Sequence, residues 1–230
     1  MRLSTSLLAL ALTAAAVAPA SIAQAQSGTY NFAVGAGTEN RQRDISKSEG
    51  KAYTWGRGTW NSDNNRVYVQ AAYETLDMGG ADVGLAAFTG VRQSVLGWDG
   101  DFQISYKALV DANAGFDDET YEAKIDLTRK FGATRTRLRA EYSPDGLGVT
   151  EEWVWVSAYA AYPVTRNLTA SAELGYRDQE NNISYTGYNV GATYALTSKL
   201  GVDVRWHGTD GNVPVKAHKD RVVASVSYAF

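Results

Sequence analysis

Residues 121–142, YEAKIDLTRKFGATRTRLRAEY, contain two runs of alternating side chains on either side of Gly132-Ala133. Glycine at the first of two turn positions suits a type II′ turn, whose twist matches that of antiparallel strands. Such a turn pairs Phe131 with Thr134 and fixes the register of the two strands. A slip of one residue would move every side chain to the opposite face. The stretch therefore predicts a β-hairpin with one apolar face and one charged face.

The predicted register brings side chains of matching kind together across the hairpin. The apolar neighbours are Leu127 with Leu138, Ile125 with Ala140 and Ala123 with Tyr142. Opposite charges meet on the other face, and such cross-strand pairs stabilise antiparallel sheets. The expected charged pairs are Asp126 with Arg139 and Lys124 with Glu141.

Similar alternation recurs along the rest of the chain. Further runs bounded by turn residues lie at 29–38, 51–60, 66–75, 81–92, 101–110, 149–162, 168–177, 183–196, 200–207 and 221–230. With the hairpin they give about 12 strands of roughly ten residues, long enough to cross a bilayer when tilted. Ten strands remain an alternative, because the first half is less regular. The pattern predicts an all-β fold, an antiparallel transmembrane β-barrel.

Turns and loops alternate in length in the second half of the chain. Short turns at 132–133, 163–167 and 197–199 alternate with longer loops at 143–148, 178–182 and 208–220. Outer-membrane barrels have short periplasmic turns and longer outer loops, so we expect both termini in the periplasm. Aligning the strands around 163–167 predicts the pairs Ser157–Glu173, Trp155–Gly175 and Trp153–Arg177, the last with a cation–π contact.

The first 25 residues have the three parts of a secretory signal peptide. They are Arg2, an apolar run at 7–17 and a small-x-small cleavage site at 23–25. The apolar run is shorter than the ~20 residues that a membrane-spanning helix needs. The expected organisation is a signal peptide at 1–25 and an outer-membrane β-barrel at 26–230. Cleavage would leave 21 Lys and Arg (22 − 1) against 25 Asp and Glu, a net charge of −4 that argues against nucleic acid as a partner.

Three features favour a membrane barrel over a secreted soluble β-protein, which is the third alternative. The uncharged face is rich in Ala, Val and Tyr and poor in the Leu and Phe that fill a soluble core. Aromatic residues near strand ends on this face resemble the girdles at bilayer interfaces: Phe131, Tyr142, Tyr162, Tyr176, Tyr194, Trp206 and Tyr228. The last strand ends with Tyr228 and Phe230, which looks like the assembly signal of outer-membrane barrels.

Two short stretches resemble a family of proteobacterial outer-membrane proteins of unknown function. Residues 43–51, RDISKSEGK, resemble the family's R-G-I-S-Q-x-x-G-K-P stretch, with Asp44 in place of Gly and Ala52 in place of Pro. Residues 141–145, EYSPD, are similar to its Y-Y-S-P-D, and the final Phe230 also fits. The resemblance implies an outer-membrane barrel and no particular activity.

The sequence offers little for enzyme chemistry, and we expect the protein not to be an enzyme. It has no cysteine, and neither of its two histidines, His207 and His218, lies in a motif with a serine nucleophile. No pair of histidines has metal-ligand spacing. Gly35-Ala36-Gly37 is not followed by a helix pattern, which argues against a nucleotide site. We expect no catalytic residue, metal site or cofactor, and we expect His207 to be a hydrogen-bonded lumen residue.

The charged faces of the strands are expected to line the lumen. The candidates are Glu122, Lys124, Asp126, Arg135, Arg137, Arg139, Glu141, Glu173, Asp203, Arg205 and His207. Opposite charges should pair, because a buried charge needs a partner. The row of three arginines at 135–139 exceeds its local carboxylates and favours anions.

The polar loop at 40–51 carries two further candidates, Arg41 and Arg43. This loop has three interpretations. It enters the lumen as a constriction, it contacts lipopolysaccharide phosphates outside, or it is simply solvated. We favour the solvated loop.

These patterns predict a protein of the bacterial outer membrane, exported through a cleaved N-terminal signal. We expect a small passive channel for hydrophilic solutes or ions, with an anion bias. The alternative is a closed structural, adhesive or lipopolysaccharide-binding barrel without transport. The expected partners are outer-membrane lipid and lipopolysaccharide, the barrel assembly machinery and small solutes. A continuous wet lumen favours the channel, whereas a lumen crossed by salt bridges favours the closed barrel.

Overall fold

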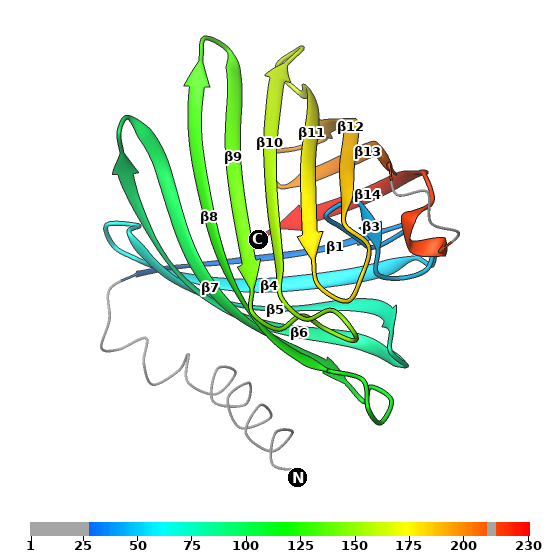
Figure 1. Cartoon of the computed structure of the whole chain (residues 1–230). Helices are drawn as coiled ribbons and strands as arrows, with labels where there is room; N and C mark the ends of the chain where they lie inside the picture. Colours follow the sequence, from blue (N-terminus) through cyan, green and yellow to red (C-terminus); the bar gives the residue numbers. More distant parts are fainter. Residues whose placement is uncertain (1–27, 211–214) are drawn as a thin grey trace.

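The computed structural model describes residues 28–210 and 215–230, so the predicted signal peptide lies outside the described residues. Within the described part, twelve strands form one closed antiparallel barrel (Figure 1). The predicted fold class is confirmed, with 12 strands rather than the alternative of ten. Among the same residues, no helix combines the length and the apolar character that crossing a membrane requires.

Most barrel strands pair with their neighbours in the chain, and β1 closes the ring against β14. The barrel strands are β1 (Gly28–Gly37), β4 (Tyr53–Ser62), β5 (Val67–Met78), β6 (Ala81–Val95), β7 (Trp98–Val110), β8 (Glu119–Phe131), β9 (Thr134–Ser143), β10 (Trp153–Pro163), β11 (Leu168–Gln179), β12 (Tyr185–Ala195), β13 (Leu200–Thr209) and β14 (Arg221–Ala229). A separate two-stranded sheet contains β2 (Arg41–Gln42) and β3 (Ile45–Ser46), and the 3₁₀ helix η1 (Lys216–His218) precedes β14.

The hairpin of β8 and β9 has the predicted register. Phe131 pairs with Thr134, and all five predicted neighbours lie opposite each other. Gly132 has φ +58°, as the first position of a type II′ turn requires. Arg139 donates two hydrogen bonds of 2.7 Å to Asp126. The expected ion pair of Lys124 with Glu141 is wrong, because Glu141 accepts instead from an arginine of the loop between β1 and β4.

The alternating pattern places apolar side chains on the outside of the barrel. Val156, Leu174 and Val190 on the neighbouring strands β10, β11 and β12 are each about half exposed. The aromatic residues predicted near the strand ends are also exposed: Phe131, Tyr142, Tyr162, Tyr176, Tyr194, Trp206 and Tyr228. A soluble protein seldom exposes apolar residues over so large an area. The barrel is therefore apolar outside and polar inside.

The predicted register of β10 and β11 is wrong by two residues. Trp155 lies opposite Arg177, and Glu173 lies opposite Tyr159. The difference arises in the connecting turn, where Thr165 Oγ1 accepts hydrogen bonds from the backbone N–H groups of Asn167 and Leu168. This turn lets Pro163 pair with Thr169. The predicted cation–π contact is present although Arg177 and Trp153 are diagonal and not direct neighbours across the strands. The Arg177 guanidinium lies 4.6 Å from the centre of the Trp153 ring.

Gly175 is needed for packing inside the barrel. A Cβ atom at this position would overlap the ring of Trp155, which is buried with Trp153 and Tyr185. We therefore expect Gly175→Ala to lower stability by about 1–3 kcal/mol, as overpacking typically does. The thermal midpoint of the folded barrel in detergent measures this change. Gly201→Ala is the matched control, because its nearest side-chain atom lies 3.7 Å from the added Cβ. Equal midpoints for the two variants would contradict this account of Gly175.

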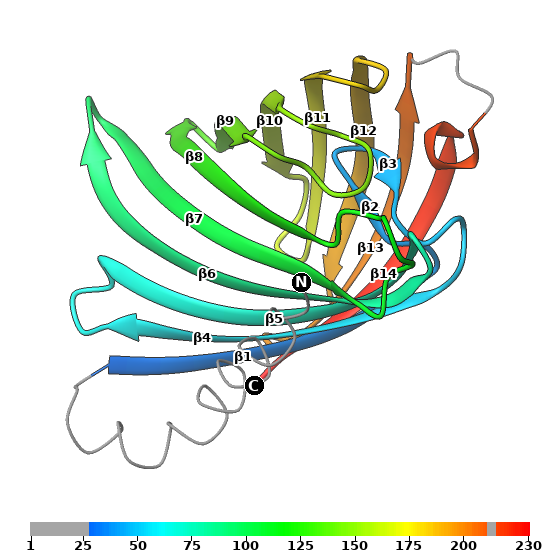
Figure 2. The same ribbon diagram turned by 60° about the horizontal axis from the view of Figure 1, so that its bottom comes forward.

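The segment between β1 and β4, residues 38–52, lies within the ring of strands (Figure 2). We call it the inward loop. Its Glu39, Asn40, Asp44, Ser46, Lys47 and Ser48 are all buried. The prediction of a solvated loop is wrong, and the alternative in which the loop enters the lumen is confirmed.

Candidate functional site

The inward loop is held in shape by its own hydrogen bonds. Arg43 and Asp44 both have positive φ, 53° and 64°, which allows the tight turn between β2 and β3. Ser46 Oγ accepts from the backbone N–H groups of Ser48 and Gly50. Ser48 Oγ accepts from the Asn40 N–H and donates to the Lys51 carbonyl. The polar sequence of this loop therefore satisfies backbone groups that burial would otherwise leave without partners.

Arg43 anchors the inward loop to β8 and β9. Its side chain is 7% exposed and donates to Glu141 at 2.5 Å and to Glu122 at 2.8 Å. The Arg43 guanidinium also lies 3.9 Å from the centre of the Trp153 ring, and its backbone carbonyl accepts from the Tyr185 hydroxyl. One cation thus has two carboxylates, which is how a buried charge can be tolerated.

Asp44 anchors the other side of the inward loop to β12 and β13. Its Oδ1 atom lies 2.7 Å from His207 Nδ1 and accepts from the Asn189 amide at 2.8 Å. His207 lies opposite Asn189 in the pairing of β12 with β13. The prediction that His207 is a hydrogen-bonded lumen residue is confirmed, whereas the role of Asp44 was not predicted.

Further contacts tie the inward loop to the wall and to the segment that contains η1. Lys47 forms an ion pair with Glu74 of β5. Arg41 donates from Nη2 to the carbonyls of Ala217, within η1, and Lys219, directly after it. The loop is therefore fixed to strands on several sides of the barrel and is not a free flap.

Burial and neighbouring charges shift the pKa values of titratable groups in the inward loop and in the segment of η1. Burial lowers the pKa of Arg43, but Glu141 and Glu122 outweigh this effect and the pKa is raised overall. For Arg41, burial lowers the pKa more than Glu39 and Asp44 raise it. Burial, together with the positive charge of Arg41, also lowers the pKa of His218, which is therefore neutral at pH 7.

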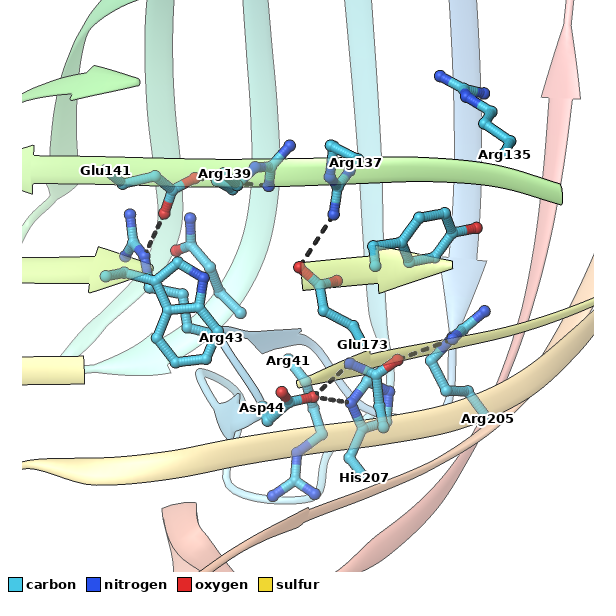
Figure 3. Close-up of a pocket in the computed structure, with 14 residues that line it drawn as sticks. Arg41, Arg43, Asp44, Arg135, Arg137, Arg139, Glu141, Glu173, Arg205 and His207 are labelled. Carbon is cyan, nitrogen blue, oxygen red and sulfur yellow. Dashed lines mark hydrogen bonds and ion pairs between the residues drawn. The ribbon is translucent and has the colours of Figure 1, made fainter. Parts of the chain in front are cut away.

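A cavity of about 360 Å³ lies between the inward loop and the strands β9 to β13, and we call it the central cavity (Figure 3). Figure 3 shows Glu141, Arg139, Arg137 and Arg135 following one another along β9. The charged lining residues are Arg41, Arg43, Asp44, Arg135, Arg137, Arg139, Glu141, Glu173 and Arg205, with His207 beside them. Among the residues that line the cavity, six arginines face three carboxylates, a formal excess of three positive charges when His207 is not counted (6 − 3).

The arginines of β9 differ in how far their charge is compensated. Arg139 has Asp126, and Arg137 donates to Glu173 at 2.9 Å. Arg135 is exposed at the end of the row, with no carboxylate partner among the described residues. The residues outside the described part contain no Asp or Glu. The excess positive charge is thus greatest towards the end of the barrel that carries the short turns.

Arg205 lies across the central cavity from the β9 row. It donates to Asn189 and Ser171 at 2.8 Å each and lies 3.2 Å from Asp203. These partners all belong to the barrel wall. Arg205 therefore contributes charge to the cavity without holding the inward loop directly.

Other hollow spaces continue from the central cavity in both directions. A turn-end vestibule of about 940 Å³ shares Arg135 with it. On the other side, a side cavity of about 310 Å³ shares Gln42, Arg139 and Glu141. A loop-end cavity of about 270 Å³ shares Gln42 and Arg43. Gln42 lines all three inner cavities, so the inward loop lies between them.

Each predicted lumen charge lies on the inner side of the barrel wall. The structure brings together Arg137 with Glu173, Arg139 with Asp126, and Arg205 with Asp203. Glu122 has a partner that was not predicted, Lys107 at 2.6 Å, in addition to Arg43. Lys124 lies 3.8 Å from Asp126. Asp44, Lys47 and Glu74 are among the inner-side residues that the sequence analysis did not single out.

Comparisons with known proteins give the fold a context. No protein-family model and no curated protein matches the sequence. The KdgM porin is similar in structure with a TM-score of 0.61 at 10% identity, covering 87% of this chain and 99% of the porin. The NanC porin gives 0.58 at 9% identity, covering 86% and 98%. An outer membrane channel from Pseudomonas putida F1 gives 0.54 at 13% identity, covering 89% and 95%. The chain therefore has the fold of small bacterial outer-membrane channels.

Proposed function

We propose that the protein is a passive channel of the bacterial outer membrane that favours small hydrophilic anions. The observation that carries this proposal is the wall of the central cavity, where six arginines face three carboxylates. Fixed charges that line a narrow pore attract ions of the opposite sign and repel ions of the same sign. The excess positive charge lies where the cavity meets the turn-end vestibule, on the path of any solute that crosses the barrel.

The inward loop sets the width of this path. Arg43 and Asp44 hold it to two separate parts of the wall, and Gln42 lines three cavities. A loop fixed in this way is a constant constriction. It would pass ions and small solutes and exclude large ones.

The outer surface supports a membrane location and argues against the secreted soluble alternative. Apolar and aromatic side chains are exposed around the barrel. Tyr228 and Phe230 at the end of the chain also lie on this surface, with their ring centres 5.1 Å apart. We infer contacts with outer-membrane lipid and lipopolysaccharide. We also infer recognition of these terminal aromatics by the barrel assembly machinery.

The proteins with similar folds agree with this proposal. Of the similar structures described above, two are porins and one is an outer membrane channel. Porins and channels are not enzymes. A solved structure of the KdgM porin is a complex with disordered oligogalacturonate. Galacturonate is a sugar carboxylate, and arginine is well suited to bind carboxylates. We assign no catalytic role to His207, whose Nδ1 atom is engaged with Asp44.

The two stretches that resemble the outer-membrane family of unknown function support membership in that family. In residues 43–51, Arg43 is the main anchor of the inward loop, and Gly50 has φ +85°. In residues 141–145, Ser143 is fully buried, and its Oγ donates to the Asp145 carbonyl. Both stretches therefore have structural roles in this barrel.

The closed barrel without transport is favoured by one observation. The inward loop crosses the lumen and is locked by ion pairs that include the buried Arg43, Glu122 and Glu141. In this alternative the internal charges serve stability, and any ligand binds to the outer loops.

Single-channel recording in a planar lipid bilayer distinguishes the two functions. The refolded mature protein is expected to give small, discrete conductance steps. A barrel that is folded, as shown by a heat-dependent shift in gel mobility, but that never conducts would contradict the channel and support the closed barrel.

A further inference from the structure

Arg177 of β11 is a buried cation that the proposed channel function does not use. The residue is 8% exposed. Its guanidinium lies 4.6 Å from the centre of the Trp153 ring, and the Arg43 guanidinium lies 3.9 Å from the same centre. Two cations thus lie against one indole ring, a strongly unfavourable arrangement unless each charge is compensated.

The two arginines differ in whether a carboxylate compensates their positive charge. Arg43 has both Glu122 and Glu141. Arg177 has no carboxylate within ion-pair distance among residues 28–210 and 215–230, and its Nε atom has no hydrogen-bond partner there. The remaining residues of the chain include no Asp or Glu. Arg177 is therefore a desolvated charge for which the protein itself supplies no counter-ion.

Arg177 lines the loop-end cavity of about 270 Å³. The charged residues around this cavity are Arg43, Lys47, Lys107, Glu122 and Arg177. Four cations thus face one carboxylate. Because Arg43, Lys47 and Lys107 are all paired, the free charge of the cavity belongs to Arg177.

We propose that the loop-end cavity is a binding site for a small organic carboxylate, with Arg177 as its counter-ion. The planar guanidinium suits the two oxygens of a carboxylate. In the lining, Gln179, Asn182 and Thr150 supply groups that can hydrogen-bond to the hydroxyls of the ligand. Phe116 and Leu147 supply an apolar side. This combination fits a single sugar acid, whose ring has polar edges and apolar faces.

The site lies among the loops that connect the strands, on the side of the inward loop away from the turn-end vestibule. It would capture an anion before the anion meets the central cavity. This role in feeding the pore rests on the proposed channel function, whereas binding itself does not require conduction.

Calorimetric titration of the refolded barrel in detergent micelles tests the site. The probes are sodium glucuronate and neutral glucose, which has nearly the same shape, at constant ionic strength. We expect glucuronate to bind at least about tenfold more tightly than glucose, because only glucuronate offers a charge-assisted pair to Arg177. Arg177→Gln should abolish this preference. Arg177→Lys keeps the positive charge but lacks the two parallel N–H donors of a guanidinium, so it should keep part of the preference for glucuronate.

Two control variants locate the binding. Arg166→Gln removes the same charge from an exposed turn and should bind glucuronate as the wild type does. Arg137→Gln removes a charge from the central cavity and should also leave most of the binding intact. Loss of binding in Arg137→Gln but not in Arg177→Gln would overturn the proposal by placing the anion in the central cavity. Equal affinity of the wild type for glucuronate and glucose would overturn it as well, even if Arg177→Gln does not fold. A barrel that binds glucuronate through Arg177 but does not conduct would refute the channel and leave this site standing.

Discussion

Replacing Arg43 with glutamine is expected to release the inward loop and raise the single-channel conductance. The wild-type guanidinium is buried between Glu122 and Glu141, at 2.8 and 2.5 Å. Without it, Glu122 keeps Lys107 at 2.6 Å, but Glu141 keeps only the more distant Arg139, at 3.5 Å, among the described residues. Removing one partner of a buried ion pair typically costs about 3–5 kcal/mol. We expect this cost to appear as undocking of the loop, because the strands themselves are held by the closed ladder of hydrogen bonds.

Arg205→Gln is the matched control for this variant. It removes one positive charge from the same cavity, but its hydrogen bonds go to Asn189, Ser171 and Asp203 of the wall. We expect higher and noisier conductance for Arg43→Gln and conductance close to the wild-type value for Arg205→Gln, both measured in planar bilayers. If the two variants change conductance equally, charge rather than docking of the loop controls the pore, and the constriction assigned to the loop is wrong.

Reversing two arginines of β9 is expected to reverse the ion selectivity. The wall of the central cavity has a formal excess of three positive charges. Arg135→Glu with Arg137→Glu changes this by four units, to −1 (3 − 4). The pore should then favour cations. Reversal potentials in a KCl gradient at about 0.1 M measure this change, since charges are not fully screened across a narrow pore at that salt concentration.

Two variants make this experiment specific. Arg135→Glu alone removes no ion pair, leaves an excess of one positive charge (3 − 2) and should give a smaller shift in the same direction. Arg166→Glu with Lys199→Glu makes the same total charge change on exposed turns outside the cavity. A shift in this turn variant as large as in the β9 variant would show that surface charge, and not the arginine row, sets the selectivity.

Much of the barrel could be predicted because its signals are local. Alternation along each strand fixes which side chains face the lipid, and a two-residue turn at Gly132 fixes the register of β8 and β9. The row of arginines on β9 follows from the same alternation. The register of β10 and β11 was missed for a related reason, since a longer turn has several shapes and Thr165 selects one of them.

The sequence could not select the lumen position of the inward loop from its three interpretations, because the partners of the loop are far away in the sequence. Asp44 forms hydrogen bonds with Asn189 and His207, which follow it by 145 and 163 positions in the sequence. Arg43 binds Glu141, which follows it by 98 positions. A polar sequence is normally read as solvated, and burial becomes favourable only when the barrel supplies matching partners. One signal was present in the sequence. Asp44 stands where the similar family has Gly, and its φ of +64° is a conformation that Gly adopts easily. The side chain that replaces Gly at this position is used, because Asp44 forms hydrogen bonds with His207 and Asn189.

The most direct test of the central claim is the reversal potential of the refolded mature wild-type protein in a planar bilayer, recorded across a tenfold KCl gradient. We expect discrete openings and a reversal potential displaced towards that of chloride, because arginines outnumber carboxylates in the central cavity. A reversal potential displaced towards that of potassium would contradict the role given to the arginine row. A folded barrel without openings would contradict the channel itself.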